Sequence, residues 1–421
     1  MASWKQYIIL VLAALPAVVG MVGEAAGAAD RDIRSAQEEH TDRLMSIDGV
    51  VGTAVGSDAV LVLCEGVEAA EAVPDRVNGV SVRTIKTGRI EALSGAPRGE
   101  GAGRPVPIGV STSARGSNDV GTIACRVTDG SMVYGLSTWH IWARGESMGS
   151  EIVQPGDSSA SDAVLGTLAG YRGVSFSGVN RADAAVALTS TEELGVATPR
   201  DGYGLPSSRI VQPSLGQDVV KYGAGTELTS GTVVGVNAVL DVRYGGRVAR
   251  FVDQIIVRGD GTFADRRDSG SLVVTEGANE PVGLLFAGGE SGQIAAANPL
   301  GEVFAAFGVS LDNRRLTDVA ITDLDASEQD GSIRVQVTVS NVGARPVNGG
   351  MDVELRVQDN GIIGSRSLSG GLSVRDAETV TFTWKPGNEA GGSESLVASH
   401  SFSDDKPEND SASVSVSAPA E

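Results

Sequence analysis

Residues 263–274 read FADRRDSGSLVV, and residues 281–289 read PVGLLFAGG. Each stretch holds a short apolar run with the length and composition of a buried strand. The polar turn DRRDSG stands directly before the first run, so its side chains would lie at the edge of a strand. Short strands joined by Gly-rich turns predict an antiparallel sandwich or barrel for this part of the chain.

The same pattern extends outward from Pro105 to about Ser310. Many short apolar runs are separated there by Gly, Asp and Asn, which favour turns. Examples are GTIACRV (121–127), MVYGLST (132–138), AAVALT (184–189), GTVVGVNAVLDVRY (231–244) and RFVDQIIV (250–257). We therefore expect one β-rich central domain over residues 105–312.

Two smaller domains flank the central one. Residues 30–95 begin with a helical pattern and continue with apolar runs, a short helix and a further strand, which predicts a small α+β domain. Residues 96–104 are rich in Gly and Pro and indicate a linker. Residues 316–418 alternate apolar and polar positions, as in SIRVQVTVSNVG, and predict an immunoglobulin-like β-sandwich of seven strands. The fold class is therefore mainly β.

The first 28 residues have the features of a secretory signal peptide. Lys5 precedes an apolar run from Tyr7 to Val22, and Ala26-Gly27-Ala28 fits the A-x-A pattern of a cleavage site. The run is short for a membrane-spanning helix, which needs roughly 20 residues, although an uncleaved anchor stays the alternative. We expect an exported, extracellular protein, with attachment to the cell surface left open.

Composition limits the partners and cofactors. The chain has 421 residues and a net charge of −20, which argues against nucleic acid or anionic lipid as the main partner. With two Cys and three His, no structural zinc site, disulfide scaffold, metal or cofactor is predicted. Cys64 and Cys125 could form one disulfide or remain two buried thiols. The turn around Asp404 is interpreted as an acidic surface turn, with calcium binding as the alternative.

Three side chains in the central domain could form a catalytic site. His140 closes a strand-like run, Asp183 opens another, and Ser269 lies in the polar turn before a strand. A serine hydroxyl is a weak nucleophile unless an imidazole takes its proton, and the imidazole needs a carboxylate that orients it and stabilises its charged form. The order His, Asp, Ser leaves room for one barrel that carries His140 and Asp183 and a second that carries Ser269.

At these residues the chain resembles the chymotrypsin-like, or trypsin-fold, serine proteases of a prokaryotic secreted branch. DSGS at residues 268–271 is similar to the nucleophile turn GDSGG, LSTWHIWA (136–143) to the segment that carries the base, and DAAVAL (183–188) to the segment that carries the orienting Asp. The resemblance covers about residues 105–310, and it implies a double β-barrel that hydrolyses peptide bonds of a polypeptide substrate.

The resemblance also implies a role for each residue. Ser269 would be the nucleophile, His140 the general base and acid, and Asp183 the group that holds His140. The backbone N–H groups of Ser269 and Arg267 would form the oxyanion hole. We expect the Ser269 hydroxyl at about 2.6–3.2 Å from a ring nitrogen of His140.

Substrate binding is implied at three further positions. Gly288 and Gly289 would line the groove, and Phe263 would lie near the base of the primary pocket, where it does not favour an Arg or Lys preference. Arg267 stands where the family usually has Gly, which leaves a preformed oxyanion hole in question. No new N-terminus of the IVGG type precedes the barrel, so Asp268 is expected to pair with Arg266 or a backbone donor instead of a freed amine.

The flanking domains suggest partners and an alternative function. The C-terminal sandwich resembles CARDB-type modules and is a candidate site for a cell-surface partner. The domain at 30–95 is a candidate pro-domain that shields the groove or assists folding, because it directly precedes the barrel. The alternative to a protease is a non-catalytic exported adhesion or binding protein that keeps the barrel as a scaffold.

Overall fold

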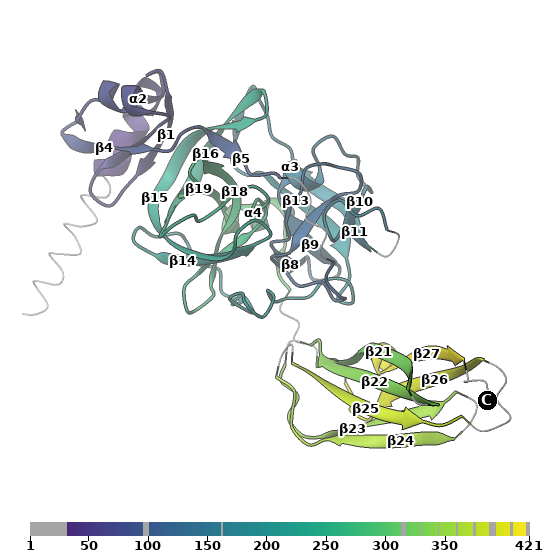
Figure 1. The fold of residues 1–421 in the computed structure, drawn as a ribbon. Helices are drawn as coiled ribbons and strands as arrows, with labels where there is room; N and C mark the ends of the chain where they lie inside the picture. Colours follow the sequence, from purple (N-terminus) through teal and green to yellow (C-terminus); the bar gives the residue numbers. More distant parts are fainter. Residues whose placement is uncertain are drawn as a thin grey trace, which may run out of the picture. The chain divides into compact units, whose positions relative to one another are not determined.

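The computed structural model describes residues 32–95, 101–160, 163–312, 317–329, 331–343, 345–358, 361–373, 376–386, 393–404 and 407–417. The predicted signal peptide and residues 96–100 of the predicted linker lie outside these ranges. The chain forms two compact units, Met1–Asp312 and Asn313–Glu421 (Figure 1).

A closed barrel forms the second half of the first unit. Its strands are β14 (Asp218–Gly223), β15 (Glu227–Tyr244), β16 (Arg247–Gly259), β17 (Leu272–Thr275), β18 (Pro281–Gly289) and β19 (Ile294–Pro299). They pair in the order β16-β19-β18-β17-β14-β15, and a further pairing of β15 with β16 closes the ring. The helix α4 (Leu300–Phe307) follows β19. The two stretches at 263–274 and 281–289 thus supply neighbouring antiparallel strands, as their pattern predicts.

A second curved sheet precedes the closed barrel in the chain. It consists of β6 (Ser111–Ala114), β7 (Gly121–Thr122), β8 (Cys125–Thr128), β9 (Val133–Ser137), β10 (Glu151–Val153), β11 (Val164–Arg172), β13 (Ala184–Thr189) and β20 (Ser310–Leu311). Hydrogen bonds join Ile123, just before β8, to Gly109 and Val110, just before β6, and so bring the two ends of the sheet together. The short helix α3 (Trp139–Trp142) follows β9, and β12 (Val179–Asn180) pairs with β16.

The N-terminal residues of the unit add an α+β layer to the closed barrel. A helix over residues 32–45 precedes β1 (Val50–Val55), β2 (Val60–Cys64), α2 (Val67–Ala72), β3 (Arg76–Val77), β4 (Val80–Lys86) and β5 (Ile90–Ala92). The strand β1 pairs with β15, so these strands continue the barrel sheet instead of forming a sheet of their own. In Figure 1, β5 leaves this layer and runs along the barrel between β15 and β18.

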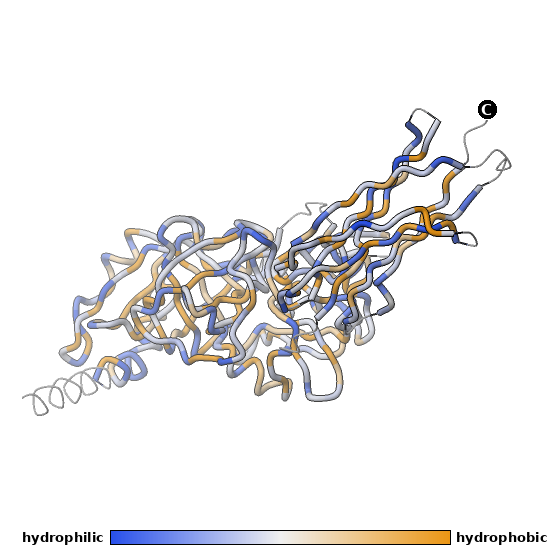
Figure 2. Tube along the Cα trace, turned by 90° about the horizontal axis from the view of Figure 1, so that it is seen from below, coloured by the Kyte–Doolittle hydropathy of each residue, from blue (hydrophilic) through white to orange (hydrophobic). Residues whose placement is uncertain are grey.

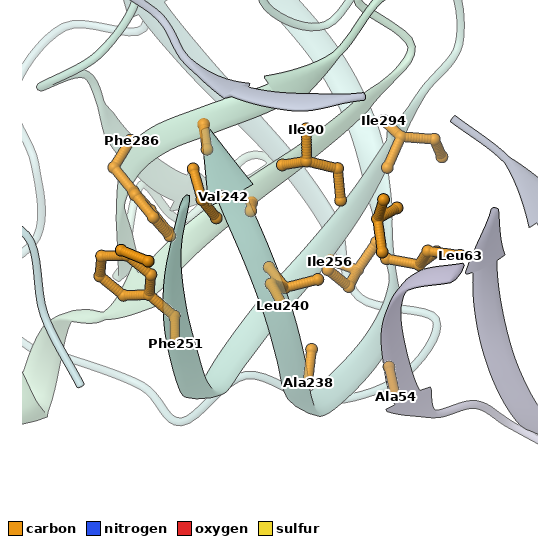
Figure 3. Packing of buried hydrophobic residues seen from close by; sticks show 14 of the residues in the cluster. Ala54, Leu63, Ile90, Ala238, Leu240, Val242, Phe251, Ile256, Phe286 and Ile294 are labelled. Carbon is orange, nitrogen blue, oxygen red and sulfur yellow. The ribbon is translucent and has the colours of Figure 1, made fainter. Parts of the chain in front are cut away.

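Apolar side chains from both parts fill one continuous core. Figure 3 shows Leu63 from β2 and Ile90 from β5 among Leu240, Phe251 and Phe286 of the barrel. Burial of each such side chain contributes about 1.5–3 kcal/mol, so this contact holds the N-terminal layer firmly on the barrel.

The second unit is a sandwich of two antiparallel sheets. One sheet contains β21 (Val319–Gln329), β22 (Ser332–Asn341) and β25 (Ala377–Trp384); the other contains β23 (Met351–Val357), β24 (Ile362–Leu368), β26 (Ser393–His400) and β27 (Ser411–Ser417). A 3-10 turn, Pro407–Asn409, precedes the last strand. Figure 2 shows hydrophobic and hydrophilic residues alternating along these strands, and the inward set forms a separate core. The seven-stranded sandwich is as predicted.

These observations confirm the predicted fold class: mainly β, with a double barrel, a small N-terminal α+β part and a C-terminal sandwich. Cys64 and Cys125 are two buried free thiols, so of the two alternatives the disulfide is wrong. Burial raises the pKa of both thiols. Among the described residues, no helix has the length and apolar character needed to cross a membrane.

Candidate active site

The predicted base and its carboxylate are held together in the first sheet. His140 lies in α3, directly after β9, and Asp183 lies one residue before β13, which pairs with β9. The Nδ1 atom of His140 is 2.6 Å from Oδ2 of Asp183, and the backbone N–H of His140 donates to Oδ1 at 3.2 Å. Both side chains are buried, so this contact is protected from water. Its effect is to orient the imidazole with Nε2 on the opposite side.

A tyrosine from the other barrel completes the surroundings of Asp183. The hydroxyl of Tyr244, the last residue of β15, donates to Oδ2 of Asp183 at 2.7 Å. The Tyr244 ring meets His140 edge to face at 5.6 Å between centroids. Burial and the neighbouring carboxylate raise the pKa of Tyr244 well above its ordinary value. Tyr244 therefore stays a neutral donor that helps to fix Asp183.

The predicted nucleophile lies on a tight turn of the closed barrel, just before β17. Gly270 has φ of +96°, and a Cβ there would lie 2.0 Å from the carbonyl oxygen of Thr122. Thr122 also donates its backbone N–H to the carbonyl of Ser269 at 2.7 Å and its hydroxyl to the carbonyl of Arg267 at 2.7 Å. Thr122 belongs to β7, in the same sheet as β9, which leads into the helix of His140. Hydrogen bonds from this sheet therefore hold the turn that carries Ser269.

The expected hydrogen bond between the Ser269 hydroxyl and a ring nitrogen of His140 is not formed, so this prediction is wrong. The Ser269 hydroxyl donates to the carbonyl oxygen of Phe286 at 2.8 Å and accepts the N–H of Leu93 at 3.1 Å. Nε2 of His140 is buried and has no hydrogen-bond partner among the described residues. A hydroxyl has one proton, so its bond to Phe286 keeps it from donating to the imidazole.

Arg267 adopts the backbone conformation that a glycine would take. Its φ is +79°, and its N–H donates to the carbonyl oxygen of Leu93 at 3.2 Å. The carbonyl of Leu93 therefore lies at the predicted oxyanion hole, where it accepts a hydrogen bond from the predicted donor, the N–H of Arg267. Among the hydrogen bonds of the described residues, the N–H of Ser269 supplies no second donor to that oxygen.

Asp268 fixes the turn that carries Ser269 through several buried contacts. Its carboxylate accepts the backbone N–H groups of Gly225, Thr226 and Asp265 at 2.8–3.2 Å, as the prediction of a backbone donor required. It also forms a fully buried ion pair with Lys221, Nζ to Oδ1 3.7 Å. Desolvation lowers the pKa of Lys221 to about 8, and the Asp268 carboxylate opposes that shift.

The predicted groove is occupied by the chain itself. Gly288 and Gly289 pair antiparallel with Glu91 and Ile90 of β5. A Cβ on Gly288 would lie 3.3 Å from Cδ1 of Leu93, and one on Gly289 would lie 2.5 Å from the carbonyl oxygen of Thr87, so the absence of side chains gives this segment its place. Phe263 is fully buried in the same apolar cluster as Leu93.

Three residues of this site are not identified by the sequence reasoning. Lys221 carries a signal, because it is a charged residue between the apolar residues of VVKY (219–222). Tyr244 only ends a long strand-like run, and Leu93 lies in an unremarkable segment before the linker. Their importance depends on contacts with residues that are distant in the chain.

Comparisons with known proteins found similar solved structures. No family model and no curated protein matches the chain. A solved serine protease specific for glutamic acid is 21% identical with a TM-score of 0.38, and Thermobifida fusca protease A is 20% identical with a TM-score of 0.37; each matches 49% of this chain and 100% or 97% of its own. A CARDB domain from Pyrococcus furiosus, solved with two metal ions, is 16% identical with a TM-score of 0.22, and the match covers 26% of this chain and 92% of that domain.

These solved structures belong to the two classes that the sequence motifs predict, chymotrypsin-like serine proteases and CARDB modules. At such identities and TM-scores the likeness carries no argument about activity.

Proposed function

We propose that this protein is a secreted serine endopeptidase that cleaves polypeptides through an acyl-enzyme. The observation that carries the proposal is the carbonyl of Leu93, whose oxygen accepts the N–H of Arg267 while the hydroxyl of Ser269 contacts the N–H of the same residue. A peptide thus already lies against both the proposed nucleophile and an oxyanion donor, beside an oriented His140–Asp183 pair.

In the proposed mechanism Ser269 attacks the carbonyl carbon of the bound peptide. Nε2 of His140 takes the hydroxyl proton and returns it to the leaving amine, while Asp183 stabilises the imidazolium. The N–H of Arg267 stabilises the negative oxygen of the tetrahedral intermediate. Water then attacks the acyl-enzyme: His140 takes a proton from the water and returns it to the oxygen of Ser269.

One rearrangement must precede attack. The Ser269 hydroxyl has to leave the Phe286 carbonyl and turn toward His140, whose Nε2 has no other partner among the described residues. Serine χ1 has three staggered wells, so rotation about one bond can change the partner of the hydroxyl. Burial of the unpaired Nε2 favours such a change, because an unsatisfied buried acceptor costs about 1–3 kcal/mol.

Labelling by a fluorophosphonate probe tests the proposal. We expect covalent labelling of the wild-type chain at Ser269, identified by peptide mass, and none in Ser269→Ala. Ser271→Ala is the matched control, because this neighbouring hydroxyl donates to the carbonyl of Asp268 and has no proposed role in the reaction. To expose the site, the same set is made with Leu93→Asp, a change that places a charge in the apolar cluster and weakens the hold of residues 90–95 on the groove.

The result would favour the non-catalytic scaffold if folded wild type and Leu93→Asp chains both stay unlabelled.

Secretion, a polypeptide substrate and a cell-surface partner for the sandwich belong to the same proposal. Recovery of the protein outside the cell, with a mature N-terminus after Ala28, tests the export step.

Tyr244→Phe tests the positioning of Asp183. Loss of the hydroxyl removes one donor from the buried carboxylate, and hydrogen bonds to charged groups contribute about 1.5–3 kcal/mol. We expect turnover of a peptide substrate to fall by about 10–100-fold with little change in KM, because Tyr244 orients the base through Asp183 and has no proposed contact with substrate. Tyr134→Phe, whose hydroxyl bonds the exposed Asp129, should leave both constants unchanged. Equal losses in the two variants would contradict the assigned position.

A further inference from the structure

We propose that the first substrate of this site is the Leu93–Ser94 bond of the same chain, and that the site selects an apolar residue such as leucine before the bond it cuts. The inference rests on the proposed function and adds to it the specificity and the activation step. Four sets of contacts carry it: the pairing of β5, the position of Leu93, the hold on residues after it, and the apolar surroundings of its side chain.

The backbone before the bond is bound as an extra strand. Residues 90–92 form β5, which pairs antiparallel with β18 at Ala287, Gly288 and Gly289. The other side of β5 pairs with β15 through Glu91 and Arg243. Main-chain pairing of this kind holds an extended peptide whatever its side chains are, and it fixes which residue follows at the reacting position.

Leu93 lies at the reacting position. Its N–H contacts the carbonyl oxygen of Phe286 at 3.3 Å and the Ser269 hydroxyl oxygen at 3.1 Å, and its own carbonyl oxygen accepts the N–H of Arg267 at 3.2 Å. The carbonyl carbon of Leu93 is only two bonds from that nitrogen. The hydroxyl and the oxyanion donor are therefore gathered around one peptide carbonyl, that of the Leu93–Ser94 bond.

The chain is also held after the bond. Gly95 exchanges both backbone hydrogen bonds with Val120, at 3.1 and 3.2 Å, and the hydroxyl of Ser94 donates to Asp119 at 2.9 Å. A Cβ on Gly95 would lie 2.6 Å from Cγ of Arg267, so glycine is required for this close passage. Anchors on both sides are what an endopeptidase needs in order to hold a bond in the middle of a chain.

The side chains before the bond meet an apolar site. Leu93 is 7% exposed, contacts the position that a Cβ of Gly288 would occupy, and shares a buried cluster with Phe263 and Ala264. Ile90, three residues earlier, is 2% exposed and packs against the barrel (Figure 3). Leu93 and Ile90 thus each pack into a buried cluster of hydrophobic side chains, which favours aliphatic residues at both positions.

The proposed cleavage balances as an ordinary hydrolysis. Ser269 Oγ bonds to the carbonyl carbon of Leu93 and gives its proton to Nε2 of His140. The bond between Leu93 and Ser94 then breaks, and the proton passes to the new amine of Ser94. One water hydrolyses the ester and leaves a carboxylate on Leu93. Before cleavage residues 90–95 fill the groove; afterwards residues 90–93 are no longer joined to Ser94, so both new ends can leave the groove and admit other polypeptides.

Mass spectrometry of the full chain after refolding tests the inference. We expect two fragments divided between Leu93 and Ser94, at a rate that does not depend on protein concentration, and an intact chain for Ser269→Ala. Isotope-labelled Ser269→Ala mixed with wild type should stay intact, because its own groove holds its bond. Cleavage of that labelled chain by wild type at the same rate would overturn the intramolecular step.

Substitutions at the bond test the specificity. Leu93→Met should still be cut, whereas Leu93→Asp should be cut about 100-fold more slowly, or not at all, because a carboxylate is excluded from the apolar site. Leu228→Asp is the matched control and should be cut like wild type, because this leucine is 45% exposed and has no proposed role in the groove. Equal cleavage of Leu93→Met and Leu93→Asp would overturn the proposed preference.

The fluorophosphonate experiment separates failure of this inference from failure of the proposed function. If Ser269 is labelled in Leu93→Asp but the wild-type chain never breaks at Leu93–Ser94, the protein is a hydrolase and the self-cleavage is wrong. If no folded chain is labelled and none is cut, both proposals fail together. Circular dichroism of each variant confirms that an uncut chain is folded.

Discussion

His140→Ala is expected to slow peptide hydrolysis by about 10⁴–10⁶-fold, the largest effect of any single change proposed for this protein. The imidazole is the base proposed to take the proton of Ser269, and its Nδ1 contact with Asp183 at 2.6 Å would have no replacement in alanine. A residual rate would remain, because the Arg267 N–H and the peptide-binding strand are unchanged.

The measurement uses a peptide with the sequence of residues 90–95, Ile-Glu-Ala-Leu-Ser-Gly, and follows the new amine. Both the reference chain and the His140→Ala chain carry Leu93→Asp. Without this change, wild type would cut residues 90–95 and open its groove, whereas His140→Ala would keep its groove blocked. His40→Ala is the matched control: His40 bonds to Asn78 on the N-terminal layer, and its loss should leave the rate unchanged. A loss below tenfold for His140→Ala would remove it from the mechanism.

Lys221→Met is expected to lower the free energy of unfolding of the first unit by about 3–5 kcal/mol. The ammonium is fully buried, lies 3.7 Å from Oδ1 of Asp268 and donates to the carbonyl of Glu227 at 2.9 Å. Methionine has a similar length but cannot donate a hydrogen bond, so the carbonyl of Glu227 and the Asp268 carboxylate would both lose a buried partner. Because Asp268 stands between Arg267 and Ser269, labelling of Ser269 should fall as well.

Denaturant unfolding at pH 7 measures this effect. Lys86→Met, on an exposed position of β4, is the matched control and should change stability by no more than about 0.5 kcal/mol. The double variant Lys221→Met, Asp268→Asn should recover part of the loss, since it removes the isolated charge. If Lys221→Met is as stable as wild type, the ion pair has no structural role.

The same pair predicts a dependence on pH. Desolvation lowers the pKa of Lys221 to about 8 in the folded protein, below the ordinary value of 10.5 expected for the unfolded chain. The cost of burying the ammonium is therefore fully present below pH 8 and disappears as the pH rises toward 10.5. Over this window wild type should gain stability relative to Lys221→Met, and a constant difference would contradict the shifted pKa.

Some parts of the site follow from local sequence. The strand periodicity of FADRRDSGSLVV and PVGLLFAGG predicts two buried strands after a polar turn, and in the fold they are the neighbours β17 and β18. The order of His140, Asp183 and Ser269 likewise predicts one sheet for the first two and a second for the last, as observed. Local signals succeed here because alternation and turn chemistry act over a few residues.

By itself, the sequence determined the strands, the sandwich, the residue types at the predicted site and the exclusion of a disulfide scaffold. Only the tertiary structure decided that the hydroxyl of Ser269 bonds to Phe286, that Tyr244 and Lys221 support Asp183 and Asp268, and that residues 90–95 lie in the groove. The physical reason is sequence distance: Leu93 and Ser269 are 176 residues apart, and their contact exists only because separate strands of one barrel sheet bring them together.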